Sequence, residues 1–332
     1  MKRLLIALAV VLCGGIFLIS KMQTKESEVP EEVQWVEPGV VEVALDALEE
    51  ETQPERRSKE RERPTVVAMD GSEELLVFPD PDVDRVRRLF DLGNDQLPIV
   101  ETLVYHSQVP WLKGRPAWVA DYSAHFETSR HFIARSLNRS LNYFKQDVRD
   151  GDRFNVFRLE HPIRFYLLVD ISQSKLWFYY HDLTTDERVL LKTYPVVLGK
   201  KRLGVSLTPV GKFPLGDRIA IYKPKTMGFF RGKKIEMIRV FGTRWIPIDV
   251  EFEDDSFPER GYGIHGMPWQ ENSEGILEED LKSVPRYASD GCIRMRQKDI
   301  EELFAIVITK PTEVEVVQHF EQAHLPGVEK NL

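Results

Sequence analysis

Between residues 71 and 160, two segments alternate hydrophobic and polar positions with the period of an α-helix. Apolar residues recur every three or four positions over residues 82–92 and 129–143, which predicts two amphipathic helices. Short apolar runs at 97–105 and 116–122 predict strands, and residues 150–157 form a turn-like segment that leads into another strand. We therefore expect a small α+β region over residues 71–160.

From residue 165 onward the pattern changes to short runs of β-branched and aromatic residues separated by turn residues. Ser172-Gln173-Ser174 separates the first two runs and predicts a hairpin, and a glycine-containing connection covers 199–204. A helical period occurs only at 299–307. This half is predicted to be a mostly antiparallel β domain with one helix. Its strands are expected at 165–171, 175–180, 190–198, 208–213 and 313–318.

The N-terminus carries an apolar run of 17 residues, from Leu4 to Ser20, preceded by Lys2 and Arg3 and followed by Lys21. As a helix this run would be about 26 Å long, the short end of a membrane span. The preceding positive charges predict that Met1 stays cytoplasmic and that the rest of the chain is exported. We therefore expect a single transmembrane helix over residues 1–21. The alternatives are a cleaved signal peptide and a lipoprotein signal at Cys13.

The next segment is strongly charged. Residues 21–64 contain 13 acidic and 7 basic side chains, and residues 49–63 have no apolar period. Such a composition cannot bury enough surface to fold, so residues 22–70 are predicted to be a disordered or partly helical tether. A solvated spacer is favoured over a binding tail. Most of the net charge of −8 lies here, and the acidic balance argues against nucleic-acid binding.

These patterns divide the chain into an anchor (1–21), a tether (22–70), an accessory region (71–160), a mostly β domain (161–320) and a C-terminal tail (321–332). The accessory region contains no recognisable catalytic or binding motif. Its histidines, His106, His125 and His131, have no metal-like spacing, so surface or core positions are favoured over a metal site.

The chain has two cysteines, too few for a disulfide scaffold or a four-cysteine zinc site. Cys13 lies in the apolar leader, which leaves Cys292 as the one thiol of the remaining chain. Cys292 lies in Ser289-Asp290-Gly291-Cys292-Ile293-Arg294, downstream of Gly263-Ile264-His265-Gly266. A neighbouring imidazole can deprotonate a thiol, and glycines let main-chain N–H groups face a carbonyl oxygen. From these residues alone, a catalytic thiol and a buried, inert cysteine both remain open.

These segments resemble the L,D-transpeptidase (YkuD-like) catalytic domain family. The resemblance covers about residues 164–318. Matching positions in the family's order are Leu168-Val169-Asp170, Gln173, Leu176, Pro195-Val196, Gly199, Thr208-Pro209-Val210-Gly211, His265-Gly266, Ser289, Gly291, Cys292, Ile293, Arg294 and Asp299.

The resemblance implies a β-sandwich or barrel-like domain that acts on peptidoglycan. Cys292 would be the nucleophile, His265 the general base and acid, and Gly266 the carbonyl that orients the imidazole. The N–H of Gly291, with that of Cys292, would bind the oxyanion, and Arg294 and Ser289 would bind substrate. No metal or cofactor is required, and carbapenem-type β-lactams are expected inhibitors.

In this interpretation the enzyme cleaves the diamino acid–D-alanine bond of a tetrapeptide stem and joins the stem to the side-chain amine of a second one. It would be a single-pass inner-membrane protein with its catalytic domain in the periplasm or otherwise outside the cytoplasm. The sequence leaves the acceptor open, so L,D-carboxypeptidase activity and protein attachment to peptidoglycan remain alternatives. Two further alternatives are a sortase-like transpeptidase and a non-catalytic wall-binding module.

The sequence departs from the family pattern in two places. Asp290 replaces the histidine before the Gly-Cys pair, and a carboxylate so close to the thiol would raise the thiol pKa unless Arg294 or Arg296 neutralises it. The loop between His265 and Ser289 is also longer than usual and contains five acidic residues and Trp269. It is interpreted either as a lid or as a surface insertion.

Overall fold

The computed structural model describes residues 82–331 except 142, 144–146, 250–260 and 282–285. The expected transmembrane helix at 1–21 and the tether at 22–70 lie outside these residues. Within the described part, no helix is long and apolar enough to cross a membrane.

The N-terminal part of the described chain contains short helices and one strand pair. The expected helix at 129–143 is observed as α4, which begins after Ser129; the hydroxyl of this residue accepts the N–H groups of His131 and Phe132. The expected helix at 82–92 is confirmed only over four residues. Strands β1 and β2 pair in antiparallel register. The elements are α2 (Arg87–Phe90), β1 (Val100–Val104), α3 (Val119–His125), α4 (Arg130–Asn138) and β2 (Arg153–Phe157).

The predicted strand at 116–122 is wrong, because α3 begins inside it. The carboxylate of Asp121 accepts the backbone N–H of Trp118 at 2.7 Å, which satisfies a donor at the start of the helix. Asp121 also forms an ion pair with Arg115, with 2.6 Å between Nη2 and Oδ1. These local polar contacts stabilise a helix start at this position, although the run of apolar residues favours a strand.

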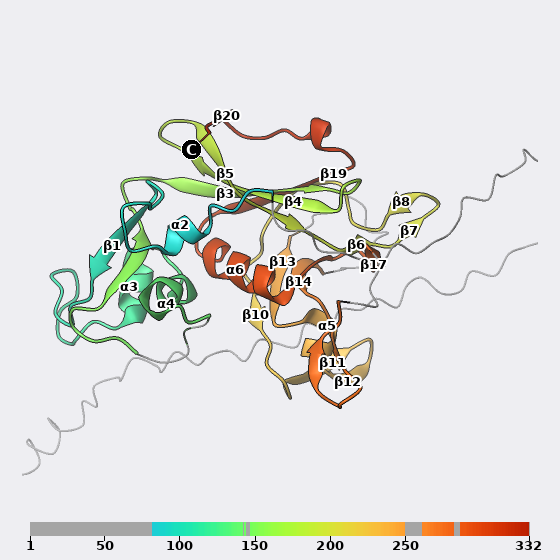
Figure 1. Cartoon of the computed structure of the whole chain (residues 1–332), viewed down its shortest axis with the longest axis horizontal. Helices are drawn as coiled ribbons and strands as arrows, with labels where there is room; N and C mark the ends of the chain where they lie inside the picture. The colour runs from blue at the N-terminus through green and yellow to red at the C-terminus, as the bar shows by residue number, and fades with distance from the viewer. Residues whose placement is uncertain (1–81, 142, 144–146, 250–260, 282–285, 332) are drawn as a thin grey trace, which may run out of the picture. The chain divides into compact units, whose positions relative to one another are not determined.

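A six-stranded sheet forms the larger layer of the C-terminal half (Figure 1). Its order is β20-β5-β4-β3-β19-β9. The hairpin expected around residues 172–174 is confirmed by the β3–β4 pairing. However, β19 pairs with β3 in parallel, as β20 does with β5, so the sheet is mixed. Its other three pairings are antiparallel, as expected for most of this domain. The strands are β3 (Ile163–Asp170), β4 (Lys175–Asp182), β5 (Glu187–Pro195), β9 (Gly211–Pro214), β19 (Thr312–Val317) and β20 (Val328–Glu329).

A second, four-stranded sheet has the order β10-β13-β14-β18, with β14 and β18 parallel. Neither sheet closes into a barrel among the described strands, which corrects the barrel-like expectation. Three hairpins and the β6–β17 pair complete the strands. The elements are β6 (Leu198–Gly199), β7 (Lys201–Arg202), β8 (Val205–Ser206), β10 (Ala220–Ile221), β11 (Met227–Phe230), β12 (Lys233–Glu236), β13 (Arg244–Ile248), β14 (Tyr262–Gly266), β15 (Trp269–Glu271), β16 (Leu277–Glu279), β17 (Tyr287–Ser289) and β18 (Ile293–Met295).

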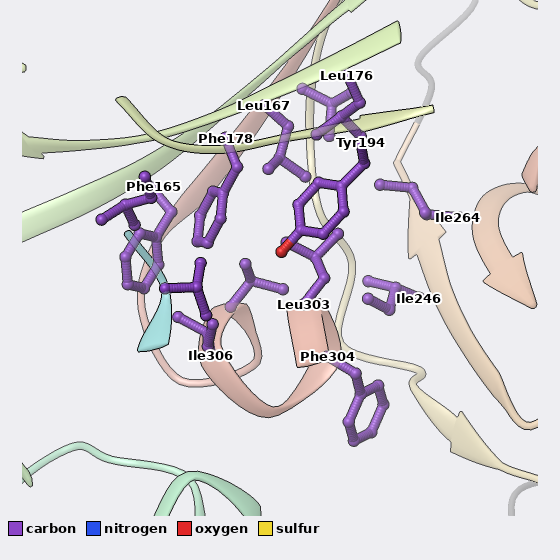
Figure 2. Packing of buried hydrophobic residues seen from close by; sticks show 14 of the residues in the cluster. Phe165, Leu167, Leu176, Phe178, Tyr194, Ile246, Ile264, Leu303, Phe304 and Ile306 are labelled. Carbon is purple, nitrogen blue, oxygen red and sulfur yellow. The ribbon is translucent and has the colours of Figure 1, made fainter. Parts of the chain in front are cut away.

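The main core lies between the six-stranded sheet, helix α6 (Gln297–Val307) and the four-stranded sheet. Figure 2 shows Leu303 and Ile306 of α6 directed toward Phe165 and Phe178 of the large sheet. Ile246 of β13 closes the same cluster from the small sheet. The helical period read at 299–307 is thus the face of α6 that fills this core. Two shorter helical segments also occur in this half, α5 (Ile238–Phe241) and the 3-10 helix η1 (Phe320–Gln322).

The N-terminal elements and the large sheet share this core. Leu89 of α2, Phe132 of α4 and Phe157 of β2 belong to the same buried cluster as Phe165. At the other end of the chain, Val328 continues the large sheet by pairing with Glu187 of β5. The segment expected to be a tail therefore contributes a strand to the domain.

Candidate active site

The thiol lies in a tight loop between two parallel strand pairs. Strand β17 pairs with β6, and β18 pairs with β14, so both ends of the Asp290–Cys292 loop are fixed by sheet hydrogen bonds. Gly291 has a φ of +126°, and a Cβ there would lie 2.4 Å from Cε1 of Tyr262. Only glycine fits this conformation and this space. The loop thus presents Cys292 next to Tyr262 of β14.

Strand register brings the histidine to the same place. His265 of β14 is directly opposite Arg294 of β18, and its side chain is 2% exposed. Its Nδ1 lies 2.8 Å from the carbonyl oxygen of Gly266. A carbonyl can only accept a hydrogen bond, so Nδ1 donates its proton and Nε2 of the neutral ring is left as the basic nitrogen. Phe241 and Trp245 pack against the ring at 5.3 and 5.8 Å between centroids.

Burial keeps both reacting groups neutral. It lowers the pKa of His265 to about 3, with a further contribution from the charge of Arg294, although the carbonyls of Gly266 and Phe241 favour the protonated ring. Burial also raises the pKa of Cys292 to about 11, which Asp290 reinforces and the Gly263 backbone and Arg294 oppose. At neutral pH the site therefore holds a thiol and an imidazole instead of a thiolate–imidazolium pair.

Arg294 contributes a half-buried positive charge to the same pocket. Burial lowers the pKa of its guanidinium, but arginine remains charged at any physiological pH. Its Nε has no hydrogen-bond partner, and no carboxylate of the described residues forms an ion pair with it. This guanidinium can therefore receive a carboxylate from a bound molecule.

Ser289 and Gly291 are engaged with one another. The Gly291 N–H donates to Oγ of Ser289 at 3.1 Å, and the Ser289 hydroxyl donates to the carbonyl of Cys292 at 2.6 Å. Ser289 is fully buried. The sequence placed Ser289 against substrate and the Gly291 N–H against an oxyanion. In the structure both groups have partners within the cysteine loop, and Ser289 holds that loop in shape.

Asp290 is neutralised by residues that the sequence did not indicate. Nη2 of Arg231 lies 2.7 Å from one carboxylate oxygen, and Nζ of Lys200 lies 3.2 Å from the other. Partial burial opposes ionisation, but these two cations outweigh it and hold the pKa of Asp290 below its usual range. Of the two arginines expected to do this, Arg296 pairs with Asp299 instead, and Arg294 forms no ion pair with Asp290.

Together these groups line a cavity of about 50 Å³. It brings His265, Cys292 and Arg294 together, and Ser289 and Asp290 also line it. Sequence reasoning missed its apolar walls, because Phe230, Val240, Phe241 and Tyr262 belong to no recognised motif. The one available signal was the density of aromatic residues between 222 and 245. Among the described residues, no group of three or more potential ligands is placed to hold a metal ion.

The comparison with known families addresses this arrangement directly. Residues 164–316 match the family model of the L,D-transpeptidase catalytic domain, YkuD. The resemblance drawn from the His265 and Cys292 segments is thereby confirmed. The matched region holds the four-stranded sheet, the six-stranded sheet apart from β20, the candidate nucleophile and the candidate base.

Comparisons beyond the family are sparse. No curated protein matches the chain. Among solved structures, Bd1075 from Bdellovibrio bacteriovorus is 20% identical over 49% of this chain and 50% of that one, with a TM-score of 0.34. The helical cell shape determining protein Pgp2 from Campylobacter jejuni is 15% identical over 50% of each chain, with a TM-score of 0.31. The chain thus spans about half the length of these solved structures.

Several residues shared with the L,D-transpeptidase domain shape turns and do not line the pocket. Asp170 is fully buried and accepts the hydroxyl of Ser172, the backbone and side-chain N–H groups of Gln173 and the N–H of Phe320. Thr208 accepts the N–H of Gly199 at 2.8 Å. These contacts explain the Asp-x-x-Gln and Thr-Pro segments as structural.

Proposed function

We propose that this protein is a peptidoglycan L,D-transpeptidase that works through a cysteine acyl-enzyme. One observation carries the proposal: Cys292 and His265 line one pocket, and Gly266 holds the imidazole so that Nε2 is the basic nitrogen. The YkuD domain match supports a reaction of this type on peptidoglycan.

In the first half-reaction the sulfur of Cys292 attacks the carbonyl carbon between the diamino acid and the terminal D-alanine. Nε2 of His265 takes the thiol proton and delivers it to the nitrogen of the departing D-alanine. A thioester forms and the peptide bond breaks. Because both groups rest neutral, proton transfer has to accompany the attack.

In the second half-reaction the side-chain amine of another stem attacks the thioester. The amine loses a proton by way of His265, and the thiol of Cys292 is restored. No external energy source is needed, since the acyl-enzyme retains the energy of the cleaved bond. Attack by water would give L,D-carboxypeptidase activity from the same intermediate, and attack by a protein amine would give attachment.

Substrate recognition is proposed to use Arg294, whose half-buried guanidinium can bind a carboxylate of the stem. The developing oxyanion would be met by main-chain N–H groups of the cysteine loop. For Gly291 this requires that its N–H is shared with, or released from, the Ser289 hydroxyl. Ser289 therefore acts on the loop in this scheme, and not on the substrate.

The decisive experiment is mass spectrometry of the full-length protein with a carbapenem and then with a disaccharide-tetrapeptide. We expect a covalent carbapenem adduct at Cys292 and a cross-linked dimer of stems. Release of D-alanine without a dimer would identify a carboxypeptidase. Unchanged turnover in Cys292→Ala or His265→Ala would refute the assignment of roles, and absence of both adduct and product would favour a wall-binding module.

Localisation is a separate proposal, which rests on the apolar segment at residues 4–20 and its flanking positive charges. We propose a single-pass inner-membrane protein with the catalytic domain outside the cytoplasm. Protease added to spheroplasts should degrade the catalytic domain while a cytoplasmic marker survives. Recovery of the domain intact under these conditions would contradict the proposal.

A further inference from the structure

Three segments meet at Asp290, at the mouth of the Cys292 pocket. Arg231 comes from the turn of the β11–β12 hairpin, Lys200 from the connection between β6 and β7, and Asp290 from the cysteine loop. The two cations bind different oxygens of the carboxylate. Asp290 is therefore a bridge between segments that are distant in sequence.

The β11–β12 hairpin also forms a wall of the pocket. Phe230, the residue before Arg231, lines the cavity and packs edge-on against Phe241 at 5.7 Å between centroids. At its other end the hairpin is fixed by Arg239, which forms ion pairs with Glu236 and Glu271. The tip that carries Arg231 is exposed, so its contact with Asp290 joins the hairpin tip to the cysteine loop.

The cavity, of about 50 Å³, is small beside the ~300–1,000 Å³ of ordinary ligand pockets. A peptide stem that reaches Cys292 therefore needs a wider mouth. The Arg231 and Asp290 side chains are 46% and 39% exposed, so their ion pair is weak enough to open in water.

We propose that Asp290 is a positioning residue which, through Arg231, clamps the β11–β12 hairpin over the Cys292 pocket and so regulates access to the thiol. Lys200 is the second cation of this clamp. The inference rests on Cys292 being the nucleophile of the proposed function. It gives a role to the one position where the cysteine motif departs from the family pattern.

The test measures the labelling rate of Cys292 in the full-length protein with two neutral reagents, iodoacetamide and a polymer-conjugated maleimide. We expect Arg231→Gln to label about two- to fivefold faster with the bulky reagent, the range for loss of an exposed ion pair, and little faster with iodoacetamide. Lys233→Gln is the matched control, since it removes the same charge from the same hairpin without breaking an ion pair among the described residues. Arg231→Lys should restore slow labelling.

Salt and a double variant sharpen the test. Raising ionic strength from 0.1 to 1 M shortens the screening length from about 10 to 3 Å and should speed bulky labelling of the wild type but not of Arg231→Gln. The double variant Asp290→Asn with Arg231→Gln should be labelled by the bulky reagent no faster than the single variant Asp290→Asn. Equal rates for Arg231→Gln and wild type, or equal acceleration of both reagents, would overturn the proposal. Labelling of Cys292 requires no enzymatic turnover. A protein that lacks transpeptidase activity would therefore still report whether the hairpin limits access to the thiol.

Discussion

Cys292 and His265 illustrate how burial sets chemistry at the scale of single residues. A buried thiol resists losing its proton, and a buried imidazole resists gaining one, so the same environment moves their pKa values apart. Both groups are thereby kept neutral in the structure as it stands. Reactivity toward simple reagents should consequently be low at neutral pH.

Alkylation of Cys292 by iodoacetamide tests this directly. The thiol pKa of about 11 predicts that the rate rises about tenfold for each pH unit between 7 and 10, because only the thiolate reacts. His265 does not interrupt this rise, since its pKa of about 3 leaves it neutral throughout. The rate can be followed by mass spectrometry. A rate that is already constant between pH 6 and 8 would instead indicate a preformed thiolate–imidazolium pair.

Gly291→Ala should disable the cysteine loop. The new Cβ would lie 2.4 Å from the Tyr262 ring and 2.9 Å from the carbonyl oxygen of Leu207, at a φ that strains any L side chain. We expect about 1–3 kcal/mol lower stability and loss of acyl-enzyme formation, measured by thermal unfolding and carbapenem labelling. Gly204→Ala is the control, because Gly204 also has a positive φ but nothing within 4 Å of its Cβ position. It should retain labelling.

At the scale of elements, the long loop after His265 folds into the β15–β16 hairpin. Glu279 of β16 accepts the N–H of Gln297 at the start of α6, at 2.6 Å. At the opposite end of the hairpin, Glu271 forms an ion pair with Arg239 near α5. The described part of this loop is thus attached to two helices that flank the site.

This attachment predicts a pH-dependent stability. Burial raises the pKa of Glu279 to about 7, although the Gln297 N–H opposes the shift, so the folded state favours the protonated acid. The wild type should therefore lose about 1–3 kcal/mol of stability as pH rises from about 4.5 through 7. Glu279→Gln should remove that loss, as followed by urea unfolding at each pH. Glu278→Gln, on the exposed side of the same strand, should behave as wild type.

On the scale of the whole molecule, one buried lysine joins the N-terminal segment to helix α6 of the main core. Nζ of Lys192 in β5 lies 2.8 Å from Asp84 and 2.7 Å from Glu302 of α6. Tyr194 donates a further hydrogen bond to Glu302 at 2.9 Å. The side chain of Lys192 is 9% exposed, and its ammonium is shared by Glu302, which is 21% exposed, and by the more exposed Asp84.

Lys192→Met should consequently destabilise the molecule by about 2–4 kcal/mol, because it leaves two carboxylates without their shared cation while keeping most of the apolar stem. Thermal unfolding should show one transition at a lower temperature. Lys330→Met, which breaks an exposed pair with Glu187, should cost less than about 1 kcal/mol. Two separate transitions in the wild type would show that the shared core does not couple the two parts.

The sequence by itself determined those features that depend on local pattern. The 3.6-residue period of α6 and the hairpin around residues 172–174 follow from short-range preferences, and both are observed. The motif residues around His265 and Cys292, together with the ordered matches upstream of them, were enough to indicate the family, because such loops need particular residues whatever surrounds them. The local pattern predicted a strand at 116–122, where the structure has the start of helix α3, capped by the carboxylate of Asp121.

Tertiary structure alone decided whatever depends on segments that are distant in the chain. The parallel pairing of β3 with β19, and of β14 with β18, is set by how apolar faces share one core, and no local period encodes it. The partners of Asp290 were missed for the same reason, since Lys200 and Arg231 lie 90 and 59 residues away. Burial, which makes the thiol and imidazole neutral, likewise exists only once the chain is packed.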